Sequence, residues 1–376
     1  KVAIIGAGAS GLTCGYYLVR NGYEVDVYEQ ESVAGGVLAF GIPEYRLPKE
    51  VLAHEISLIE KTGVRIHLNT QIGKDIAFEQ LKKDYDSVYV ATGTQFPEKI
   101  RVEGEDLPGV IHGINFLKEV NSNMKYRIDG KVIVIGGGNT AIDSARTALR
   151  CGASEVIVLY RRTIDAMPAY EAEIHEAVSE GVRIIELASP KRFIQGQNGR
   201  VSQIECFNMQ LAEFDNSGRR KSKAIENSTF KIDADLVIVA VSQYSDLPFI
   251  RKEEIGVTRW GTFVVDGKTL MTTMDGVFAG GDVTRGPDTV IQAIADGKKA
   301  AESIDRYLGG KGLLNKGMRI DLPTVADEDE IVALHRFPLD ILDVENRKSS
   351  FSEVVLGYHK LNAMAEAMRC LHCDRR

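Results

Sequence analysis

Two glycine-rich segments could bind phosphate groups: "GAGASG" at residues 6–11 and "GGGNTA" at residues 136–141. Each follows a short run of β-branched and apolar residues, which is typical of a buried strand. The first glycine of such a turn allows a tight bend, the second lets the backbone approach a pyrophosphate, and the third small residue allows close helix packing. Free N–H groups at the start of the next helix also attract phosphate. The sequence therefore predicts two dinucleotide-binding units.

The two units differ in the residue that follows their second strand. In the first unit Glu29 follows Tyr28, and a carboxylate there can accept hydrogen bonds from both hydroxyls of a ribose. In the second unit Arg161 and Arg162 follow Tyr160, and guanidinium groups can bind a 2′-phosphate that a carboxylate would repel. The first unit therefore favours a dinucleotide with a free ribose, such as FAD, and the second favours NADPH. The alternative is that both arginines are solvated charges at a strand end.

The elements that must position these residues repeat along the chain. Each unit is expected to contain a strand, the glycine turn, a helix and a second strand. The expected strands are residues 2–5 and 24–28 in the first unit, and 131–135 and 156–159 in the second. This pattern predicts an α/β fold with two Rossmann-like domains.

Two later segments also favour a flavin. "DSVYVATGT" at 86–94 predicts a buried strand ending in small residues that let the backbone approach a nucleotide. "GVFAGGDVTRGPDTVIQAIADGKKAA" at 276–301 predicts a strand, a turn containing Asp282, and a helix that begins near Asp288 or Thr289. The positive end of that helix would stabilise negative charge on a reduced flavin. The alternative is an ordinary strand, loop and helix.

Composition limits the classes of partner and compartment. The 376 residues suggest two or three domains, and the net charge of −7 gives no reason to expect a nucleic acid or an anionic membrane. No apolar run approaches the roughly 20 residues of a membrane helix. The N-terminus has no signal-peptide pattern. The chain begins with Lys1 and enters a predicted strand at once, so the question of a segment upstream of Lys1 stays open. Five scattered cysteines indicate a reducing compartment, so we expect a cytoplasmic protein.

These motifs resemble the two-dinucleotide-domain flavoproteins, and within them the glutamate synthase small-subunit-like group. That group includes the flavin and NADPH portion of dihydropyrimidine dehydrogenase and the NADPH-side subunits of ferredoxin-linked, electron-bifurcating complexes. The resemblance covers about residues 1–310, and "GGVLAFGIPEYRLPK" at 35–49 and "MPAYEAEIHEA" at 167–177 are among its motifs. Disulfide reductases with this fold place two redox cysteines in the 35–49 region. This chain has none there, which argues against thiol–disulfide exchange at the flavin.

The resemblance implies an FAD domain with an inserted NADPH domain and a C-terminal tail. The expected divisions are 1–117 and 251–310 for the FAD domain, 128–250 for the NADPH domain, and 311–376 for the tail. A β-rich excursion with turns at "GQNGR" and "DNSGRRKSK" is expected between Pro190 and Asp235.

The resemblance also implies two sets of binding residues. The residues expected to bind FAD are Gly6, Gly8, Ala9, Ser10, Gly11, Glu29, Gln30, Gly36, Val37, Gly41, Ile42, Arg46, Ala91, Thr92, Gly93, Gly281, Asp282, Thr289 and Val290. Those expected to bind NADPH are Gly137, Gly138, Asn139, Thr140, Arg161 and Arg162. One segment departs from the family pattern Ala-Ile-Gly-Gln-x-Pro-(Asp/Asn) at the nicotinamide site. There "AVSQYSD" at 240–246 has Ser242 and Ser245 in place of the glycine and the proline.

The tail carries a cysteine pair that could bind a metal. Residues 363–369 are expected to form a helix leading to Cys370-x-x-Cys373, a spacing at which two thiolates can bind one metal or cluster. In the family "EA-x-R-C-L-x-C" commonly introduces ligands of a [4Fe-4S] cluster. The other ligands would come from residues beyond Arg376, from an upstream segment or from a partner chain. The alternative is a pair of free surface thiols. The other cysteines are expected to be packing residues: Cys14, Cys151 and Cys206.

Together these features predict hydride exchange between NADP(H) and FAD, with single electrons passing to iron–sulfur clusters of a larger complex. Whether that complex bifurcates electrons stays open. The cofactors perform this chemistry and the protein positions them, so we expect no catalytic acid or base. Arg46 and the helix end at Thr289 would tune the flavin potential. The expected partners are iron–sulfur subunits of a hetero-oligomeric complex, and ferredoxin is a further candidate. Two alternatives stay open: a glutamate synthase small subunit, and a non-catalytic scaffold that binds nucleotides.

Replacing Arg161 and Arg162 by alanine should weaken the binding of NADPH far more than that of NADH, because only NADPH carries the 2′-phosphate. Dissociation constants of both nucleotides, measured by titration, test this. An equal loss of affinity for the two would refute the assignment.

Overall fold

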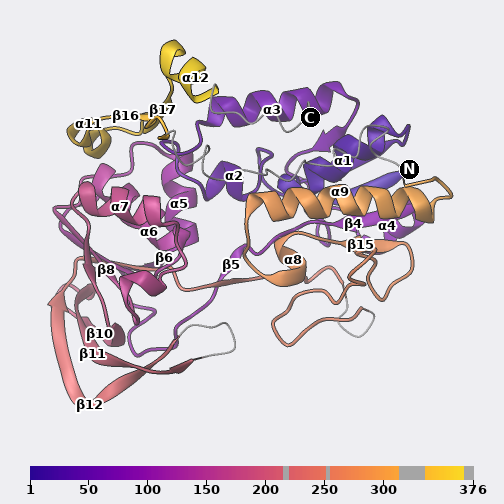
Figure 1. The fold of residues 1–376 in the computed structure, drawn as a ribbon. Helices are drawn as coiled ribbons and strands as arrows, with labels where there is room; N and C mark the ends of the chain where they lie inside the picture. The colour runs from indigo at the N-terminus through magenta and orange to yellow at the C-terminus, as the bar shows by residue number, and fades with distance from the viewer. Residues whose placement is uncertain (215–219, 251–254, 313–334, 368–376) are drawn as a thin grey trace.

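The computed structural model describes residues 1–214, 220–250, 255–312 and 335–367. Two parallel five-stranded sheets, each covered by helices, lie side by side (Figure 1). We call them the first unit and the second unit. Each has a glycine turn at the carboxyl end of a central strand, which is where α/β folds bind nucleotides.

The first unit has the strand order β15-β4-β1-β2-β3. Its strands are β1 (Val2–Ile5), β2 (Val25–Tyr28), β3 (Arg65–His67), β4 (Ser87–Val90) and β15 (Val277–Ala279). On one face pack α1 (Ala9–Arg20), α3 (Lys49–Lys61) and α9 (Val290–Tyr307). On the other face pack α4 (Phe78–Asp84) and residues 247–250 and 255–263. Because both faces are covered, β1 and β4 are buried along their whole length.

The second unit has the strand order β6-β13-β7-β8-β9. Its strands are β6 (Val110–His112), β7 (Lys131–Ile135), β8 (Glu155–Leu159), β9 (Arg183–Ile185) and β13 (Leu236–Val239). The helices on one face are α5 (Gly113–Ser122), α6 (Asn139–Arg150) and α7 (Glu171–Ser179), with the 3₁₀ helix η1 (Ile164–Ala166) before α7. An antiparallel sheet of β10 (Ala188–Gln195), β11 (Val201–Phe214) and β12 (Arg220–Asp233) packs on the other face, where the β-rich excursion was predicted.

The second unit is inserted in the first, and two short antiparallel strands carry the crossings. The chain leaves the first unit through β5 (Phe96–Pro97) and returns through β14 (Gln243–Tyr244). The second sheet begins before the boundary predicted at residue 117, because β6 pairs with β13 and α5 packs on the core of the second unit. Strand β6 has only three residues and carries no motif, so the sequence around it does not show to which sheet it belongs. Only its pairing with β13 shows this.

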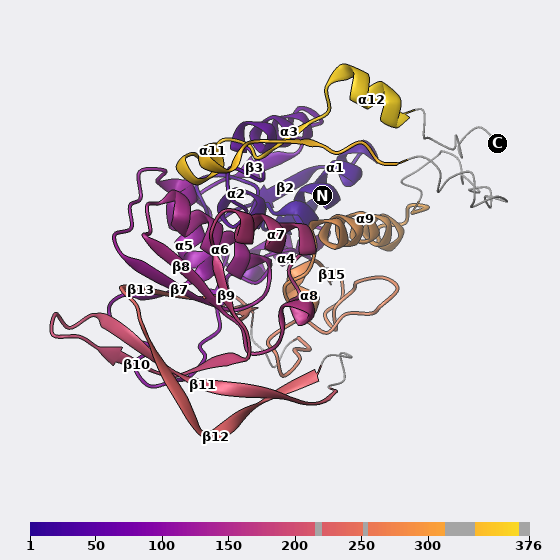
Figure 2. The ribbon, with the colours of Figure 1, turned by 60° about the vertical axis from the view of Figure 1, so that its left-hand side comes forward.

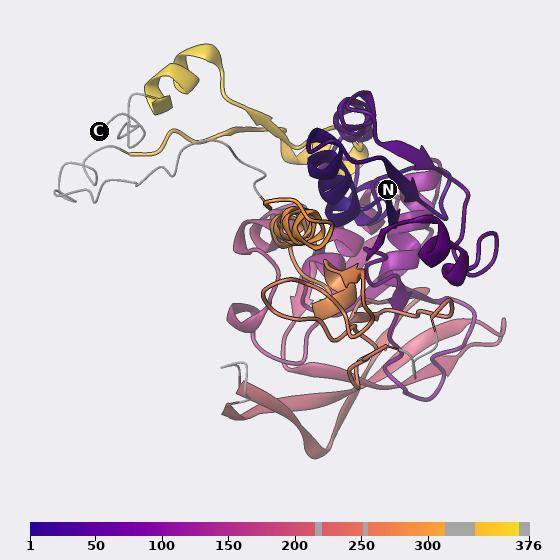
Figure 3. The same ribbon diagram turned by 90° about the vertical axis from the view of Figure 1, so that its right-hand side faces the viewer.

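Several short elements complete the structure. In the first unit α2 (Val37–Phe40) precedes α3, and α8 (Asp282–Arg285) lies between β15 and α9. The segment after the gap at 313–334 contains β16 (Asp340–Ile341), α11 (Val344–Ser349), β17 (Val355–Gly357) and α12 (Lys360–Ala367). It runs along one side of both units (Figure 2), and α12 projects from the body (Figure 3). Cys370 and Cys373 lie outside the described residues. No helix in the described ranges is long and apolar enough to span a bilayer.

Helices α1 and α9 pack at the distance that a glycine allows. A Cβ atom added at Gly297 in α9 would lie 2.2 Å from the carbonyl oxygen of Ser10 in α1. That separation is far below van der Waals contact, so any larger residue must push the two helices apart. Because both helices begin at the carboxyl edge of the sheet, their spacing also sets the geometry of that edge.

Replacing Gly297 by alanine should therefore lower the free energy of unfolding by about 1–3 kcal/mol, as overpacked cores do. Denaturant titration of both variants and the unaltered protein measures the change. Gly267→Ala is the matched control, because no atom lies within 4 Å of a Cβ at Gly267. Equal stability of the two variants would contradict this account of the helix contact.

Candidate functional site

A cleft opens at the carboxyl edge of the first sheet. It is lined by the turn after β1, the ends of β2 and β4, the start of α2, and the turn between β15 and α9. The lining residues are Gly6, Gly8, Ala9, Ser10, Glu29, Gly35, Gly36, Val37, Leu38, Ala91, Thr92, Gly93, Thr94, Gln95, Gly280, Gly281, Asp282, Asp288, Thr289, Val290 and Ala293. Most of the residues expected to bind FAD are among them.

The glycine turn after β1 is shaped by backbone contacts. Gly6 has φ +103°, and a Cβ atom there would lie 2.5 Å from the carbonyl oxygen of Ala91. Gly11 is absent from the cleft lining, because it packs against the carbonyl oxygen of Gly6. Gly8 instead precedes α1 with nothing within 4 Å of an added Cβ. The turn thus leaves open space in front of the helix N-terminus, where a phosphate group would bind.

Glu29 is 4% exposed and held by the backbone. Its Oε2 accepts a hydrogen bond from the Ala7 N–H at 2.9 Å, and its Oε1 accepts one from the Glu31 N–H at 3.0 Å. Burial raises the pKa of Glu29, and these two N–H groups partly oppose the rise. Each carboxylate oxygen retains acceptor capacity for a hydroxyl group. The neighbouring Gln30 is outside the cleft lining, and its Nε2 donates to Gln95 Oε1 at 2.7 Å.

Two buried hydroxyl groups in the cleft lack a hydrogen-bond partner among the described residues. Thr92 Oγ1 and Thr94 Oγ1 make no hydrogen bond within the part of the chain that the structure describes. Buried polar groups are normally satisfied, so these two fit a ligand that carries polar atoms. Thr92 is among the residues that the sequence predicts to bind FAD. Thr94 is not, although it belongs to the same "ATGT" sequence.

The far side of the cleft is formed by α8 and the start of α9. Helix α9 begins where it was predicted to, near Asp288 or Thr289: Thr289 is its N-cap, and the Thr289 hydroxyl accepts from the Gln292 N–H. The positive end of this 18-residue helix therefore lies at the cleft. Burial raises the pKa of Asp282 to about 6. Asp296 was missed by sequence reasoning: it is 3% exposed, and its Oδ2 accepts from the Gly281 N–H at 2.7 Å.

Three residues expected beside the flavin lie outside the cleft lining: Gly41, Ile42 and Arg46. Arg46 Nη1 lies 2.8 Å from Asp143 Oδ2, and its Nε lies 3.1 Å from Glu173 Oε1. Both acids belong to the second unit. This guanidinium therefore joins the two units, and its place beside a flavin stays a prediction.

The second glycine turn repeats the first. Gly136 has φ +146°, and a Cβ atom there would lie 2.2 Å from the carbonyl oxygen of Ala240. Gly138 is the N-cap of α6, and the nearest atom to an added Cβ is 4.0 Å away. Residues 167–170 lie over this turn: the Ala169 N–H donates to the Gly137 carbonyl, and the Tyr170 N–H donates to Asn139 Oδ1. The predicted Thr140 follows in the first turn of α6.

The two arginines after β8 have different surroundings. Arg161 is exposed at the strand end, as a phosphate-binding residue must be. Arg162 is 6% exposed, and its Nε donates to the carbonyl oxygen of Arg220 in β12 at 2.6 Å. Part of the Arg162 guanidinium therefore secures the antiparallel sheet.

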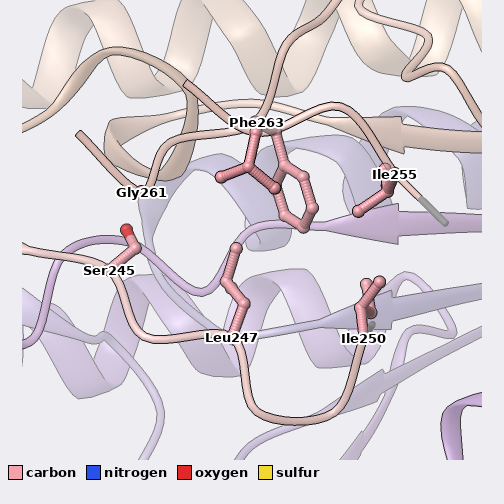
Figure 4. Close-up of a pocket in the computed structure, with 7 residues that line it drawn as sticks. Ser245, Leu247, Ile250, Ile255, Gly261 and Phe263 are labelled. Atoms are coloured by element: carbon pink, nitrogen blue, oxygen red, sulfur yellow. The ribbon is translucent and has the colours of Figure 1, made fainter. Parts of the chain in front are cut away.

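The serines that depart from the family pattern lie in the crossing between the units. Ser245 Oγ donates to the carbonyl oxygen of Gly93 at 2.7 Å, and the Glu98 N–H donates to the carbonyl of Ser242. Ser245 also borders a small pocket whose other lining residues are Leu247, Ile250, Ile255, Val257, Gly261 and Phe263 (Figure 4). These apolar side chains belong to the core of the first unit, so the pocket does not suit a charged nucleotide.

The cysteines of the described residues are packing residues, as predicted. Cys14, Cys151 and Cys206 are fully buried, and burial raises the pKa of Cys206 to about 12. Within those same ranges no group of three or more His, Cys, Asp and Glu side chains could hold a metal.

Comparison with known proteins identifies the family. Residues 1–297 match the family described as pyridine nucleotide-disulphide oxidoreductase. The whole chain is 41% identical to the NADP(+)-dependent formate dehydrogenase subunit beta of Moorella thermoacetica and 40% identical to the NADPH-Fe(3+) oxidoreductase subunit beta of Geobacter sulfurreducens. It spans only 54% and 61% of their lengths. Over 83% of its length it is 39% identical to the glutamate synthase [NADPH] small chain of Azospirillum brasilense and covers 67% of that protein.

Solved structures share the fold at low sequence identity. FprA of Mycobacterium tuberculosis in complex with NADPH superposes with a TM-score of 0.69 at 18% identity, over 82% of this chain and 84% of that one. Thioredoxin reductase of T. acidophilum gives 0.61 at 22% identity, over 82% and 97%. The predicted fold class and the predicted resemblance are thereby confirmed. The chain belongs to the pyridine nucleotide-disulphide oxidoreductase family, and within it to the group that contains the glutamate synthase small chains.

Proposed function

We propose that this chain binds FAD in the cleft of the first unit and NADP(H) at the glycine turn of the second, and exchanges hydride between them. The observation that carries the proposal is the cleft itself. It combines a buried carboxylate held by backbone N–H groups, two helix N-termini, and two threonine hydroxyls that have no hydrogen-bond partner in the described part of the chain. FAD, when bound, supplies the group that accepts or returns the hydride.

Each named residue then has a binding task. Glu29 accepts hydrogen bonds from ribose hydroxyls, and the N-terminus of α1 attracts the pyrophosphate. The positive end of α9 would stabilise negative charge on a bound flavin. Arg161 binds the 2′-phosphate of NADPH. None of these groups donates or removes a proton during the reaction, so the protein acts by binding and orientation.

We further propose that electrons pass from this chain to iron–sulfur clusters of a larger complex. Two relatives that match the whole chain are named as beta subunits, which supports a multi-subunit assembly. The Cys370-x-x-Cys373 pair supports cluster ligation. The likeness to glutamate synthase small chains favours a second candidate, in which the partner is the large chain of that enzyme. Purification of the native complex, with its subunits identified and its iron counted, separates the two.

Gly8→Ala should weaken FAD binding by about tenfold or more while leaving the fold intact, a loss of about 1.4 kcal/mol or more. The φ of −80° at Gly8 suits alanine, and the added methyl group would occupy the open space that the phosphate needs. Fluorescence titration of the FAD-free protein with FAD measures the affinity, and denaturant titration checks stability. Unchanged FAD affinity would remove the proposed phosphate site.

Addition of NADPH to the FAD-loaded protein without oxygen should bleach the flavin absorbance, and NADH should act more slowly. Stopped-flow spectroscopy measures both rates. A protein that takes up FAD but is not reduced by either nucleotide would favour the non-catalytic scaffold.

A further inference from the structure

A buried charge cluster lies where the two units and the C-terminal segment meet. It contains four arginines and four carboxylates, so the formal charges balance. Its members are Arg46, Asp143, Arg146, Arg150, Glu173, Glu176, Glu180 and Arg347. Arg46 comes from the first unit and Arg347 from the C-terminal segment, whereas the other six lie on α6 and α7 or directly after α7.

The first unit enters the cluster through Tyr45 and Arg46. Arg46 forms ion pairs with Asp143 and Glu173 of the second unit at 2.8 and 3.1 Å. Tyr45 is 1% exposed, and its ring centre lies 3.9 Å from the guanidinium carbon of Arg150. Such a cation–π contact adds to the ion pairs. Two consecutive residues of the 35–49 segment therefore bind the face of the second unit.

The second unit contributes a nearly solvent-free core to this cluster. Arg146 Nη2 lies 2.6 Å from Glu180 Oε1, and Arg150 Nη1 lies 2.7 Å from Glu180 Oε2. The side chains of Glu180 and Arg150 have no exposed surface, and that of Arg146 is 2% exposed. Because water does not screen these charges, the removal of one member leaves others unpaired.

The C-terminal segment closes the cluster. Arg347 in α11 is 7% exposed, pairs with Glu176, and lies 4.0 Å from Glu180. The Val354 N–H donates to the carbonyl oxygen of Tyr45 at 3.0 Å. This segment therefore contacts the second unit through Arg347 and the first unit through Tyr45.

The angle between the units matters because each is proposed to bind one nucleotide. The covalent crossings are the two-residue strands β5 and β14. Two such short strands form a narrow connection, so contacts elsewhere must oppose rotation of one unit against the other. An error of about 1 Å between reacting atoms can slow a reaction about 100-fold.

We propose that Arg46 and Arg347 are positioning residues for hydride transfer: with Asp143, Glu173 and Glu176 they fix the angle between the two units. Docking of the C-terminal segment, residues 335–367, on both units then sets the rate of flavin reduction. This proposal rests on the proposed function. The proposal also connects the cysteine pair to the reaction, because the C-terminal segment precedes residues 370–373 in the chain.

The experiment compares Arg347→Gln with Arg347→Lys in the full, FAD-loaded chain. Arg347→Gln should lower the limiting rate of flavin reduction at saturating NADPH by about tenfold or more, with the NADPH dissociation constant and the FAD content nearly unchanged. Arg347→Lys keeps the charge and should restore most of the rate. The control is Arg183→Gln, which removes a 64% exposed arginine paired with Glu155 on the second unit and should change nothing.

Hydrogen–deuterium exchange supplies a readout that does not depend on activity. Arg347→Gln should raise exchange in residues 43–48 and in α7, and leave β7 and β8 protected. A normal rate in Arg347→Gln would overturn the proposal, whatever the exchange pattern. A loss of rate without altered exchange, or without rescue by lysine, would also overturn it. If the unaltered protein is not reduced by NADPH, the proposed function fails, and the exchange pattern then decides alone whether Arg347 holds the units together.

Discussion

Both nucleotide-binding turns depend on one steric constraint, the contact between a glycine and the end of a neighbouring strand. Beyond β4 the carbonyl of Ala91 meets Gly6, and beyond β13 the carbonyl of Ala240 meets Gly136. No side chain fits at either contact, and both glycines have positive φ. The chain therefore bends sharply, and the next helix begins at the edge of the sheet. A helix N-terminus and a strand end are thus held together in each unit, which is the arrangement proposed to bind phosphate.

Since the two turns are alike, the residues after the second strand must distinguish the ligands. Glu29 is buried and oriented by two backbone N–H groups, an arrangement suited to neutral hydroxyl groups. Arg161 is exposed, an arrangement suited to a charged phosphate. Arg162 shows that an arginine at this position is not sufficient evidence of a phosphate-binding side chain. Its Nε donates to a backbone carbonyl of the antiparallel sheet.

The 35–49 segment has a structural role where disulfide reductases carry redox cysteines. Lys49 Nζ donates to the carbonyl oxygens of Leu38, Ile42 and Leu47, and burial lowers its pKa to about 8. Asn121 of α5 donates to the carbonyl of Ile42 from the second unit. The segment is therefore shaped by internal hydrogen bonds and fastened to the second unit. This contact can exist because the segment carries Tyr45 and Arg46, which reach helices α6 and α7.

The sequence by itself determined the elements whose signals are local. The predicted strands at 2–5 and 131–135 match β1 and β7 at both ends, and Thr289 caps α9, because apolar runs, glycine turns and capping residues act over a few positions. Only the tertiary structure decided the sheet to which β6 belongs, the burial of Arg162, and the pairing of Arg46 with Asp143, 97 residues away. A guanidinium at a strand end or in a loop has the same local sequence whether it faces solvent, a phosphate or a distant carboxylate. Its partner is set by how the two units pack, which no local pattern encodes.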